Sequence, residues 1–372
     1  MSAVRSYSLS IGIIGLPNCG KSTIFNALTK SSVPAENYPF CTIDKNVGVV
    51  NIPDDFLDQI AQIYNSRTKI YSSIKFVDVA GLVKGASKGE GLGNKFLSHI
   101  RETDALMYIL RAFENPNVSH VYNKIDPIEE LDIVRTELLL KDVETAQKAL
   151  GALENNLKSG GNELLKKKVK LLCEILDSLK KGIPIAYLNL SPDQTELIKE
   201  FSFLTQKPSF YILNIDSQKN EKSKKWKKAL QEKLPEKEKN FVLLVDCKTE
   251  YELNMLDEKS KEEYIETIKD YKGVNDIIKM GCGLLNLITF YTVNENEAHS
   301  WVVKNGITAI EAGGVVHTDF MKRFISAEVI SVEDFIKYNG WKNAKEKGKV
   351  RLEGKNYIVK DRECINIIIG GE

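Results

Sequence analysis

Short apolar runs alternate with amphipathic stretches through the first third of the chain. The runs cover 11–14, 74–77 and 105–110, and two later runs cover 210–213 and 241–245. Apolar runs of this length between helical patterns are typical of buried strands in a parallel sheet. The pattern therefore predicts an α/β domain.

A different pattern lies between the third and fourth of these runs. Apolar residues recur at steps of four and three from Leu139 to Leu157 and again from Leu165 to Leu179, with a Ser-Gly-Gly-Asn break at 159–162. This heptad spacing is typical of helices that pack along their length. We expect an antiparallel helical (coiled-coil) arm over about 130–205, inserted into the α/β domain. Its lysine-rich outer face fits a solvated surface, with an RNA or protein contact as the alternative.

The chain changes character again from about residue 286. Runs of Thr, Val, Ile and Phe are broken by Gly-Gly at 313–314 and Asn-Gly at 339–340, and the chain closes with an apolar run at 365–369. This pattern predicts a small α+β domain. A length of 372 residues allows two or three domains. We expect a first domain over 9–285, which includes the arm, and a second over 286–369.

Composition and charge limit the class of protein. The formal charge is +1, from 52 basic and 51 acidic residues, which argues against a generally basic nucleic-acid binder but allows a local patch. The six cysteines are scattered, without a CxxC pair or a histidine at zinc-site spacing, and indicate free thiols in a reducing compartment. No apolar run has the length of a signal peptide or a membrane span. We expect a cytoplasmic protein that makes no membrane contact.

The clearest chemical signal is Gly-Leu-Pro-Asn-Cys-Gly-Lys-Ser at 15–22. It follows the apolar run at 11–14 and opens a helical pattern. Glycines let backbone amides approach phosphate oxygens, Lys21 brings a positive charge to them, and the Ser22 hydroxyl suits Mg²⁺. The sequence therefore predicts a phosphate-binding loop of a nucleoside triphosphatase.

Two further segments fit the same site. Asp78 and Gly81 form a DxxG motif after the run at 74–77, so we expect Asp78 to hold Mg²⁺ and the Gly81 amide to meet the γ-phosphate. Thr42 lies between the two motifs and is the natural switch ligand for Mg²⁺, with an ordinary loop threonine as the alternative. Leu82 stands where Ras-like enzymes carry the glutamine that orients water. Another group must orient water, or hydrolysis is slow.

Asn18, within the phosphate loop, has two interpretations. Its side chain can ligate a monovalent cation such as K⁺, which would neutralise charge that develops during hydrolysis, or it can cap the loop structurally. The sequence does not separate them.

Two segments compete as the base-binding site. Asn123-Lys-Ile-Asp126 is a literal NKxD motif, which reads guanine, but no buried strand precedes it. Asn214 directly follows the run at 210–213, and Asp246-Cys-Lys, a candidate closing loop, comes about 32 residues later. We therefore place the base site at Asn214. Ser217 stands at the fourth position, where guanine recognition needs a carboxylate, so we expect weak selection for guanine and use of adenine or of both bases.

Together these motifs resemble the Obg-like ATPases, also called YchF proteins. The resemblance runs along nearly the whole chain, through GLPNCGKST at 15–23, NYPFCTID at 37–44, FVDVAGLVKGASKGEGLGNKFL at 76–97, IRETDA at 100–105, FENPNVSHV at 113–121, HTDF at 317–320 and GKNYIVKD at 354–361. It implies a P-loop G-domain with a parallel-type sheet, a helical arm and a C-terminal TGS domain of β-grasp type. It also implies Mg²⁺-dependent hydrolysis of ATP in preference to GTP, and association with ribosomes, at the large subunit.

The resemblance also assigns roles by position. Ser22 and Thr42 become Mg²⁺ ligands, Asn214 and Ile215 become base contacts, and the phosphate-binding run consists of Asn18, Cys19, Gly20, Lys21, Ser22 and Thr23. His120 takes the place of the missing glutamine, whereas the residues alone indicate only a histidine on a surface loop. The family usually has a glutamate where this chain has Ser217.

We therefore expect a monomeric, nucleotide-switched ATPase that works on ribosomes or other RNA. Lys21, Gly81 and His120 are the expected catalytic residues, and Mg²⁺, with K⁺ as a second candidate, is the expected cofactor. An Obg-type GTPase is one alternative. A slow-turnover, nucleotide-gated ribosome- or RNA-binding switch is the other, and the apolar Leu82 would suit it.

Overall fold

The structure is a computed structural model, which describes residues 9–30, 46–79, 99–118, 124–158, 160, 162–216, 221–268 and 270–371. The chain divides into two compact units. The larger unit comprises 10–48 and 76–277, and the smaller unit comprises 1–9, 49–75 and 278–372. In this division residues 49–75 fall in the smaller unit, whereas the predicted first domain ran over 9–285.

A six-stranded sheet with the order β2-β4-β1-β5-β6-β7 forms the core of the larger unit, and its strands β2 and β4 continue into residues 49–51 and 73–75, which the division assigns to the smaller unit. Its strands are β1 (Ser10–Ile14), β2 (Val47–Asn51), β4 (Ser73–Asp78), β5 (Ala105–Arg111), β6 (Ser209–Asn214) and β7 (Val242–Val245). The neighbouring strands β1 and β5, β5 and β6, and β6 and β7 pair in parallel. Every residue of β5 and β6 is buried, as expected for strands covered on both faces. The predicted parallel α/β sheet is confirmed.

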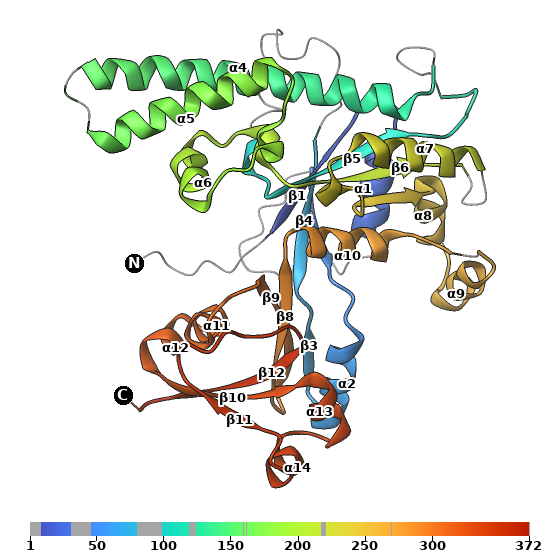
Figure 1. Cartoon of the computed structure of the whole chain (residues 1–372). Coiled ribbons are helices and arrows are strands. Elements are labelled where there is room, and N and C mark those ends of the chain that lie inside the picture. Colours follow the sequence, from blue (N-terminus) through green and yellow to red (C-terminus); the bar gives the residue numbers. More distant parts are fainter. Residues whose placement is uncertain are drawn as a thin grey trace. The chain divides into compact units, whose positions relative to one another are not determined.

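The helices α1 (Lys21–Lys30), α4 (Pro127–Lys158) and α7 (Glu221–Lys233) contact strands of this sheet (Figure 1). The same part of the chain also forms α5 (Glu163–Lys180), α6 (Pro192–Ile198), α8 (Cys247–Leu253), α9 (Glu258–Glu266) and α10 (Val274–Leu284), with short 3₁₀ turns η3 (Ile185–Tyr187), η4 (Lys199–Phe201), η5 (Leu204–Gln206) and η6 (Glu236–Glu238). No helix in the described part of the chain is long and apolar enough to cross a membrane.

The helices α4 and α5 form the arm and lie side by side (Figure 1). Their shared apolar cluster contains most of the predicted heptad positions, among them Ala146, Leu150, Leu172 and Leu179. The buried Asp142 carboxylate accepts hydrogen bonds from the backbone amides of Leu204 (2.9 Å) and Thr205 (2.7 Å), which fixes η5 against α4. Burial raises the pKa of Asp142. The arm is thus built from heptad packing along its length and a buried polar anchor.

The smaller unit holds a second six-stranded sheet, in the order β11-β10-β12-β8-β9-β3. Its strands are β3 (Thr68–Ile70), β8 (Leu287–Val293), β9 (Glu297–Lys304), β10 (Phe324–Ser331), β11 (Arg351–Glu353) and β12 (Glu363–Ile369), and its helices are α2 (Asp55–Tyr64), α11 (Ala309–Val316), α12 (Thr318–Arg323), α13 (Val332–Lys337) and α14 (Trp341–Glu346). The adjacent residues Phe290 and Tyr291 of β8 belong to different apolar clusters, one with α11 and one with α2, α13 and α14. Both faces of this mixed sheet are therefore packed.

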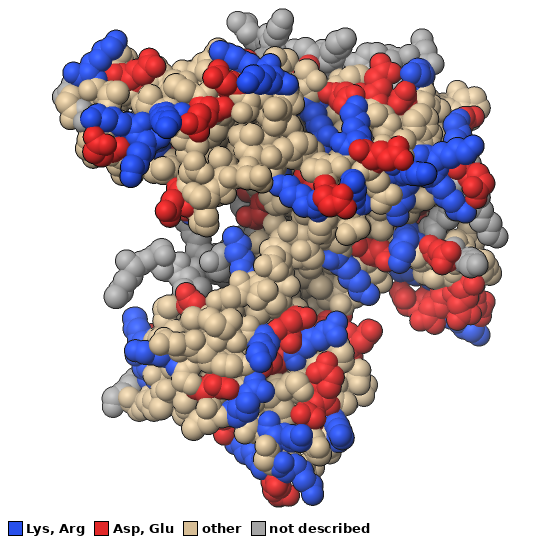
Figure 2. All heavy atoms as spheres, viewed as in Figure 1, with Lys and Arg blue, Asp and Glu red and all other residues tan. Residues whose placement is uncertain are grey.

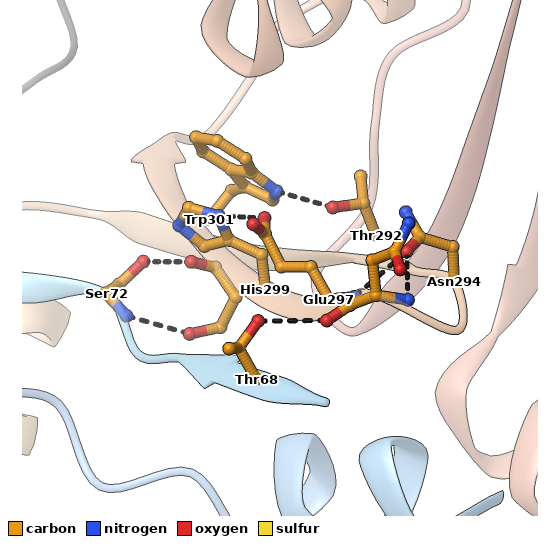
Figure 3. A network of polar contacts seen from close by, with 9 residues as sticks. Thr68, Ser72, Thr292, Asn294, Glu297, His299 and Trp301 are labelled. Carbon is orange, nitrogen blue, oxygen red and sulfur yellow. Dashed lines mark hydrogen bonds and ion pairs between the residues drawn. The ribbon is translucent and has the colours of Figure 1, made fainter. Parts of the chain in front are cut away.

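Backbone pairing explains why residues 49–75 belong to the smaller unit. Strand β3 pairs in parallel with β9 at the edge of the sheet. Figure 3 shows Ser72 beside β9, where its amide donates to the Ser300 hydroxyl at 2.9 Å, and Thr68, whose hydroxyl donates to the Asn296 carbonyl at 2.9 Å. These contacts join residues 228 positions apart, which no local pattern in the sequence reveals.

Candidate nucleotide-binding site

The loop at 15–20 links β1 to α1, and two of its residues require glycine. A Cβ on Gly15 would lie 2.4 Å from the Ile109 carbonyl oxygen. Gly20 has a φ of +106°, and a Cβ there would lie 2.2 Å from Nδ2 of Asn214. Only glycine fits so close to backbone and amide groups. The loop therefore follows β5 and β6 closely and presents its own backbone at the start of α1.

Lys21, the first residue of α1, is almost fully buried. Its Nζ donates hydrogen bonds to the carbonyl oxygens of Gly15 (3.1 Å) and Leu16 (2.7 Å). The first turn of α1 contains no acidic residue. A lysine and the amides of a helix N-terminus together make a site for anions, because the helix dipole has its positive end there.

Ser22 and Asp78 lie together beside this loop. The Ser22 hydroxyl donates to Oδ2 of Asp78 at 3.1 Å. Asp78 ends β4, which lies next to β1 in the sheet, so the two predicted Mg²⁺ ligands meet at one edge. Burial raises the pKa of Asp78, and the Ser22 hydrogen bond and the Lys21 charge oppose that shift. Thr42 and Gly81 lie outside the described residues.

The side chain of Cys19 has a structural role in the phosphate loop. Its side chain is buried, and burial raises the pKa of the thiol to about 11. A thiol with such a pKa is protonated at neutral pH and therefore a poor nucleophile. Its backbone carbonyl has a further role, because it binds Asn214.

Asn214, the last residue of β6, joins the phosphate loop to a second loop. Its Nδ2 donates to the Cys19 carbonyl at 2.8 Å, and its Oδ1 accepts from the Cys247 amide at 3.2 Å. Asp246 caps α8 by accepting from the amides of Lys248 (3.1 Å) and Thr249 (3.0 Å). The two segments that the sequence predicted for base binding, 214–216 and 246–248, are therefore brought together beside the phosphate loop.

A cavity of about 580 Å³ opens over these loops. Its lining contains the phosphate loop, the base-side segments and one wall that the sequence analysis missed: Asn18, Gly20, Lys21, Ser22, Thr23, Phe113, Glu114, Asn115, Val118, Asn214, Ile215, Asp216, Asp246 and Lys248. The missed wall, 113–118, directly follows β5. Ligands in open α/β sheets bind at the carboxyl ends of the strands, so its position after β5 was the signal that could have found it.

Arg111 holds this wall in place. It is buried at the end of β5, and its guanidinium donates to the carbonyl oxygens of Phe113 (3.4 Å), Asn115 (3.5 Å) and Val118 (2.9 Å). Its backbone amide donates to the buried carboxylate of Glu130 in the first turn of α4 at 2.9 Å. The buried residues Arg111 and Glu130 therefore connect the 113–118 wall of the cavity with the first turn of α4.

In the described part of the NKxD sequence, residues 124–126, the side chain of Asp126 stabilises the start of α4. Oδ1 of Asp126 accepts from the amides of Ile128 and Glu129, both at 3.2 Å, which caps α4. The Lys124 ammonium lies 2.9 Å from Oδ2 of Asp126. Neither side chain lines the cavity. Asn123 and His120 lie outside the described residues.

Comparison with known proteins agrees with this geometry. A family model described as "Protein of unknown function (DUF933)", YchF-GTPase_C, matches residues 287–369, and one described as "50S ribosome-binding GTPase" matches 10–147. The ribosome-binding ATPase YchF of Haemophilus influenzae is 44% identical over 356 residues, which cover 95% of this chain and 97% of that protein. The chain belongs to the YchF family. The same-named protein of Bacillus subtilis is 38% identical, covering 96% and 98% of the two chains.

A solved structure supports the same family. The YchF GTPase of Schizosaccharomyces pombe has a TM-score of 0.85 and 33% identity, covering 97% of this chain and 98% of that one. The expected family and the α/β fold class are confirmed. Family membership and the phosphate loop at 15–22 together make the chain a P-loop nucleoside triphosphatase.

Proposed function

We propose that this chain hydrolyses ATP in a Mg²⁺-dependent reaction and that the bound nucleotide controls its association with the ribosome. The observation that carries the proposal is that Lys21, Ser22 and Asp78 lie together at the phosphate loop. Asn214 binds this loop by a hydrogen bond and lies on the base side of the cavity that the loop lines. Relatives named ribosome-binding ATPase YchF match nearly the whole chain.

The residues present fit Mg²⁺. A hydroxyl and a carboxylate, from Ser22 and Asp78, lie 3.1 Å apart, and Mg²⁺ prefers such hard oxygen ligands together with phosphate oxygens. Thr42 is the proposed third protein ligand. When bound there, Mg²⁺ would supply positive charge that neutralises the phosphate oxygens.

The rest of the phosphate machinery comes from the chain itself. Lys21 and the amides of Asn18, Cys19, Gly20, Ser22 and Thr23 would hold the triphosphate, and the Gly81 amide would contact the γ-phosphate. Because Leu82 cannot orient water, we assign that task to His120. Asn18 lines the cavity and is the proposed ligand if K⁺ is used.

The base side favours adenine or mixed use over strict guanine recognition. Asn214 and Ile215 are the proposed base contacts, and both line the cavity. Guanine selection needs a free carboxylate that accepts from two N–H groups. The Asp246 carboxylate is engaged as the cap of α8, where Oδ2 also accepts from the Thr249 hydroxyl at 2.8 Å. Asp216 lines the cavity too, but it stands one position before the one that guanine recognition needs. An Obg-type GTPase stays the alternative, since one similar structure is named a GTPase.

A side-by-side titration tests the nucleotide assignment. Dissociation constants for ATP, GTP and their non-hydrolysable analogues would be measured with Mg²⁺, on the native chain and on Lys21→Ala as the control without phosphate binding. We expect ATP to bind at least as tightly as GTP. Binding of GTP tenfold tighter than ATP would contradict the assignment and favour the GTPase.

The ribosome assignment has its own test. We expect the monomeric, cytoplasmic protein to co-sediment with large subunits more strongly with an ATP analogue than with ADP, and ribosomes to stimulate hydrolysis. Nucleotide-dependent co-sedimentation with no change in rate would favour a slow-turnover switch. Absence of co-sedimentation in every nucleotide state would contradict the ribosome partner.

A further inference from the structure

An exposed basic strip occupies residues 337–362 of the smaller unit. It holds nine basic and three acidic residues, a formal charge of +6, although the whole chain carries only +1. The nine are Lys337, Lys342, Lys345, Lys347, Lys349, Arg351, Lys355, Lys360 and Arg362. The rest of the chain therefore carries a net formal charge of −5, although it contains a second basic run at 219–228.

Most of this charge is not neutralised by neighbouring carboxylates. All nine side chains are exposed. Lys345 pairs with Glu328, Arg351 with Glu353 and Glu363, and Arg362 with Asp361. For the other six, no carboxylate of the described residues lies within ion-pair distance. These six are Lys337, Lys342, Lys347, Lys349, Lys355 and Lys360.

Packed side chains and strand pairing fix the backbone of the strip. Ala344 and Val359 are buried, and Trp341 packs edge-on against Phe335 with ring centroids 5.4 Å apart. Strand β11 pairs with β10 and fixes the middle of the strip. Figure 2 shows Lys and Arg side chains gathered over α14. The lysine stems therefore start from fixed backbone positions, although their ends remain free to move.

The chemistry of the strip suits a polyanion with many equivalent charges. Lysine ammonium groups are point charges on flexible stems and neutralise phosphates without demanding one geometry. The core of a protein interface is typically apolar, and stable membrane anchoring takes an apolar face or a lipid chain in addition to basic residues. Among the described residues of the strip, the exposed large apolar side chains are only Leu352 and Ile358. RNA is the polyanion that a ribosome presents.

We propose that the basic strip is a docking surface for the phosphate backbone of RNA. The proposal deepens the proposed ribosome association and rests on it. Binding of this kind releases counterions, so the logarithm of the binding constant falls with the logarithm of salt concentration by roughly 0.9 per neutralised phosphate on a duplex. Each lysine removed should lower that slope by about 1.

The test compares two triple variants with the same change in charge. One carries Lys342→Gln, Lys347→Gln and Lys349→Gln in the strip. The control carries Lys224→Gln, Lys225→Gln and Lys228→Gln, three exposed residues of α7 in the larger unit. Binding to a fluorescein-labelled RNA hairpin and to purified large subunits would be measured over a salt series, together with thermal unfolding and the basal rate of ATP hydrolysis.

We expect the strip variant to bind both probes at least tenfold more weakly and to lose about 3 from the salt slope, with unfolding and the basal rate unchanged. The control should bind like the native chain. Two results would overturn the strip as a docking surface and leave the proposed function intact. One is an equal loss of binding in the two variants, and the other is unchanged binding by the strip variant while the native chain binds large subunits.

Two further outcomes separate the partner classes. A native chain that binds the hairpin through the strip but never binds large subunits would keep the RNA surface and contradict the ribosome assignment. Strip-dependent binding to polyglutamate or to phosphatidylserine vesicles at the affinity seen for RNA would overturn the choice of RNA.

Discussion

Replacing Gly20 with alanine perturbs the point where the phosphate loop contacts the base side. The new Cβ would lie 2.2 Å from Nδ2 of Asn214, and φ is +106°. A residue other than glycine held in such a conformation costs about 1–3 kcal/mol. The displaced Asn214 amide makes two hydrogen bonds, to Cys19 and Cys247, each with a net value of about 0.5–1.5 kcal/mol. We therefore expect a loss of about 2–6 kcal/mol, shared between stability and nucleotide affinity.

Two measurements separate the loss in stability from the loss in nucleotide affinity. Chemical denaturation of the larger unit gives the loss in stability, and a fluorescence titration with an ATP analogue gives the loss in affinity. Gly151→Ala is the matched control, since its Cβ would meet nothing within 4 Å on helix α4. Alanine in a helix interior should stabilise the chain by about 0.5–1 kcal/mol.

A double-mutant cycle tests the cause. Asn214→Ala removes the clash and both hydrogen bonds, so its effect should not add to that of Gly20→Ala, because the two variants lose the same contact. Full additivity, or a Gly20→Ala variant as stable and as tight in binding as the native chain, would refute the claim that Asn214 locks the phosphate loop.

Three other changes have defined outcomes. Lys21→Ala should abolish measurable ATP binding in the same titration while leaving the circular dichroism spectrum unchanged; retained binding would contradict its role. Arg111→Lys should weaken nucleotide binding by about 10-fold, roughly the value of one lost hydrogen bond, since the single Nζ of lysine replaces the two guanidinium nitrogens, Nε and Nη2, that contact the carbonyls; equal affinity would show that the 113–118 wall needs no such support. Burial lowers the pKa of His299, against the opposing effect of Glu297, so its contribution to stability is present above about pH 6.5 and is lost as pH falls through the folded-state pKa. His299→Gln should therefore flatten the acid side of a stability–pH profile, whereas an unchanged profile would contradict this.

The network in Figure 3 shows why His299 responds in this way. The His299 ring stacks on Trp301 with centroids 3.6 Å apart, and its Nδ1 lies 3.0 Å from Oε1 of Glu297. The Trp301 indole donates to the Thr292 hydroxyl at 2.9 Å. Stacking removes water from the imidazole, which disfavours its charged form, and a single carboxylate compensates only in part.

Several features followed from the sequence because their cause is local. The phosphate loop at 15–22 needs glycine, lysine and serine at fixed spacing, so its chemistry is visible in eight consecutive letters. The strands β5 and β6 are buried throughout and apolar at their centres, because both faces are covered. The heptad steps predicted the packing of α4 on α5 for the same reason: neighbouring turns of a helix share a face.

Other features depend on contacts between distant segments, and only the tertiary structure decided them. Asn214 binds Cys19 across 195 positions, and β3 pairs with β9 although residues 76–277 of the larger unit lie between them in the sequence. The wall at 113–118 is held by local hydrogen bonds from Arg111, and Arg111 itself is tied to Glu130 of α4, 19 positions away. By itself the sequence determined that this protein handles phosphate at the start of α1. Which loops enclose that site was settled by hydrogen bonds between distant segments, such as those of Asn214 with Cys19 (2.8 Å) and Cys247 (3.2 Å), since only folding brings these groups together.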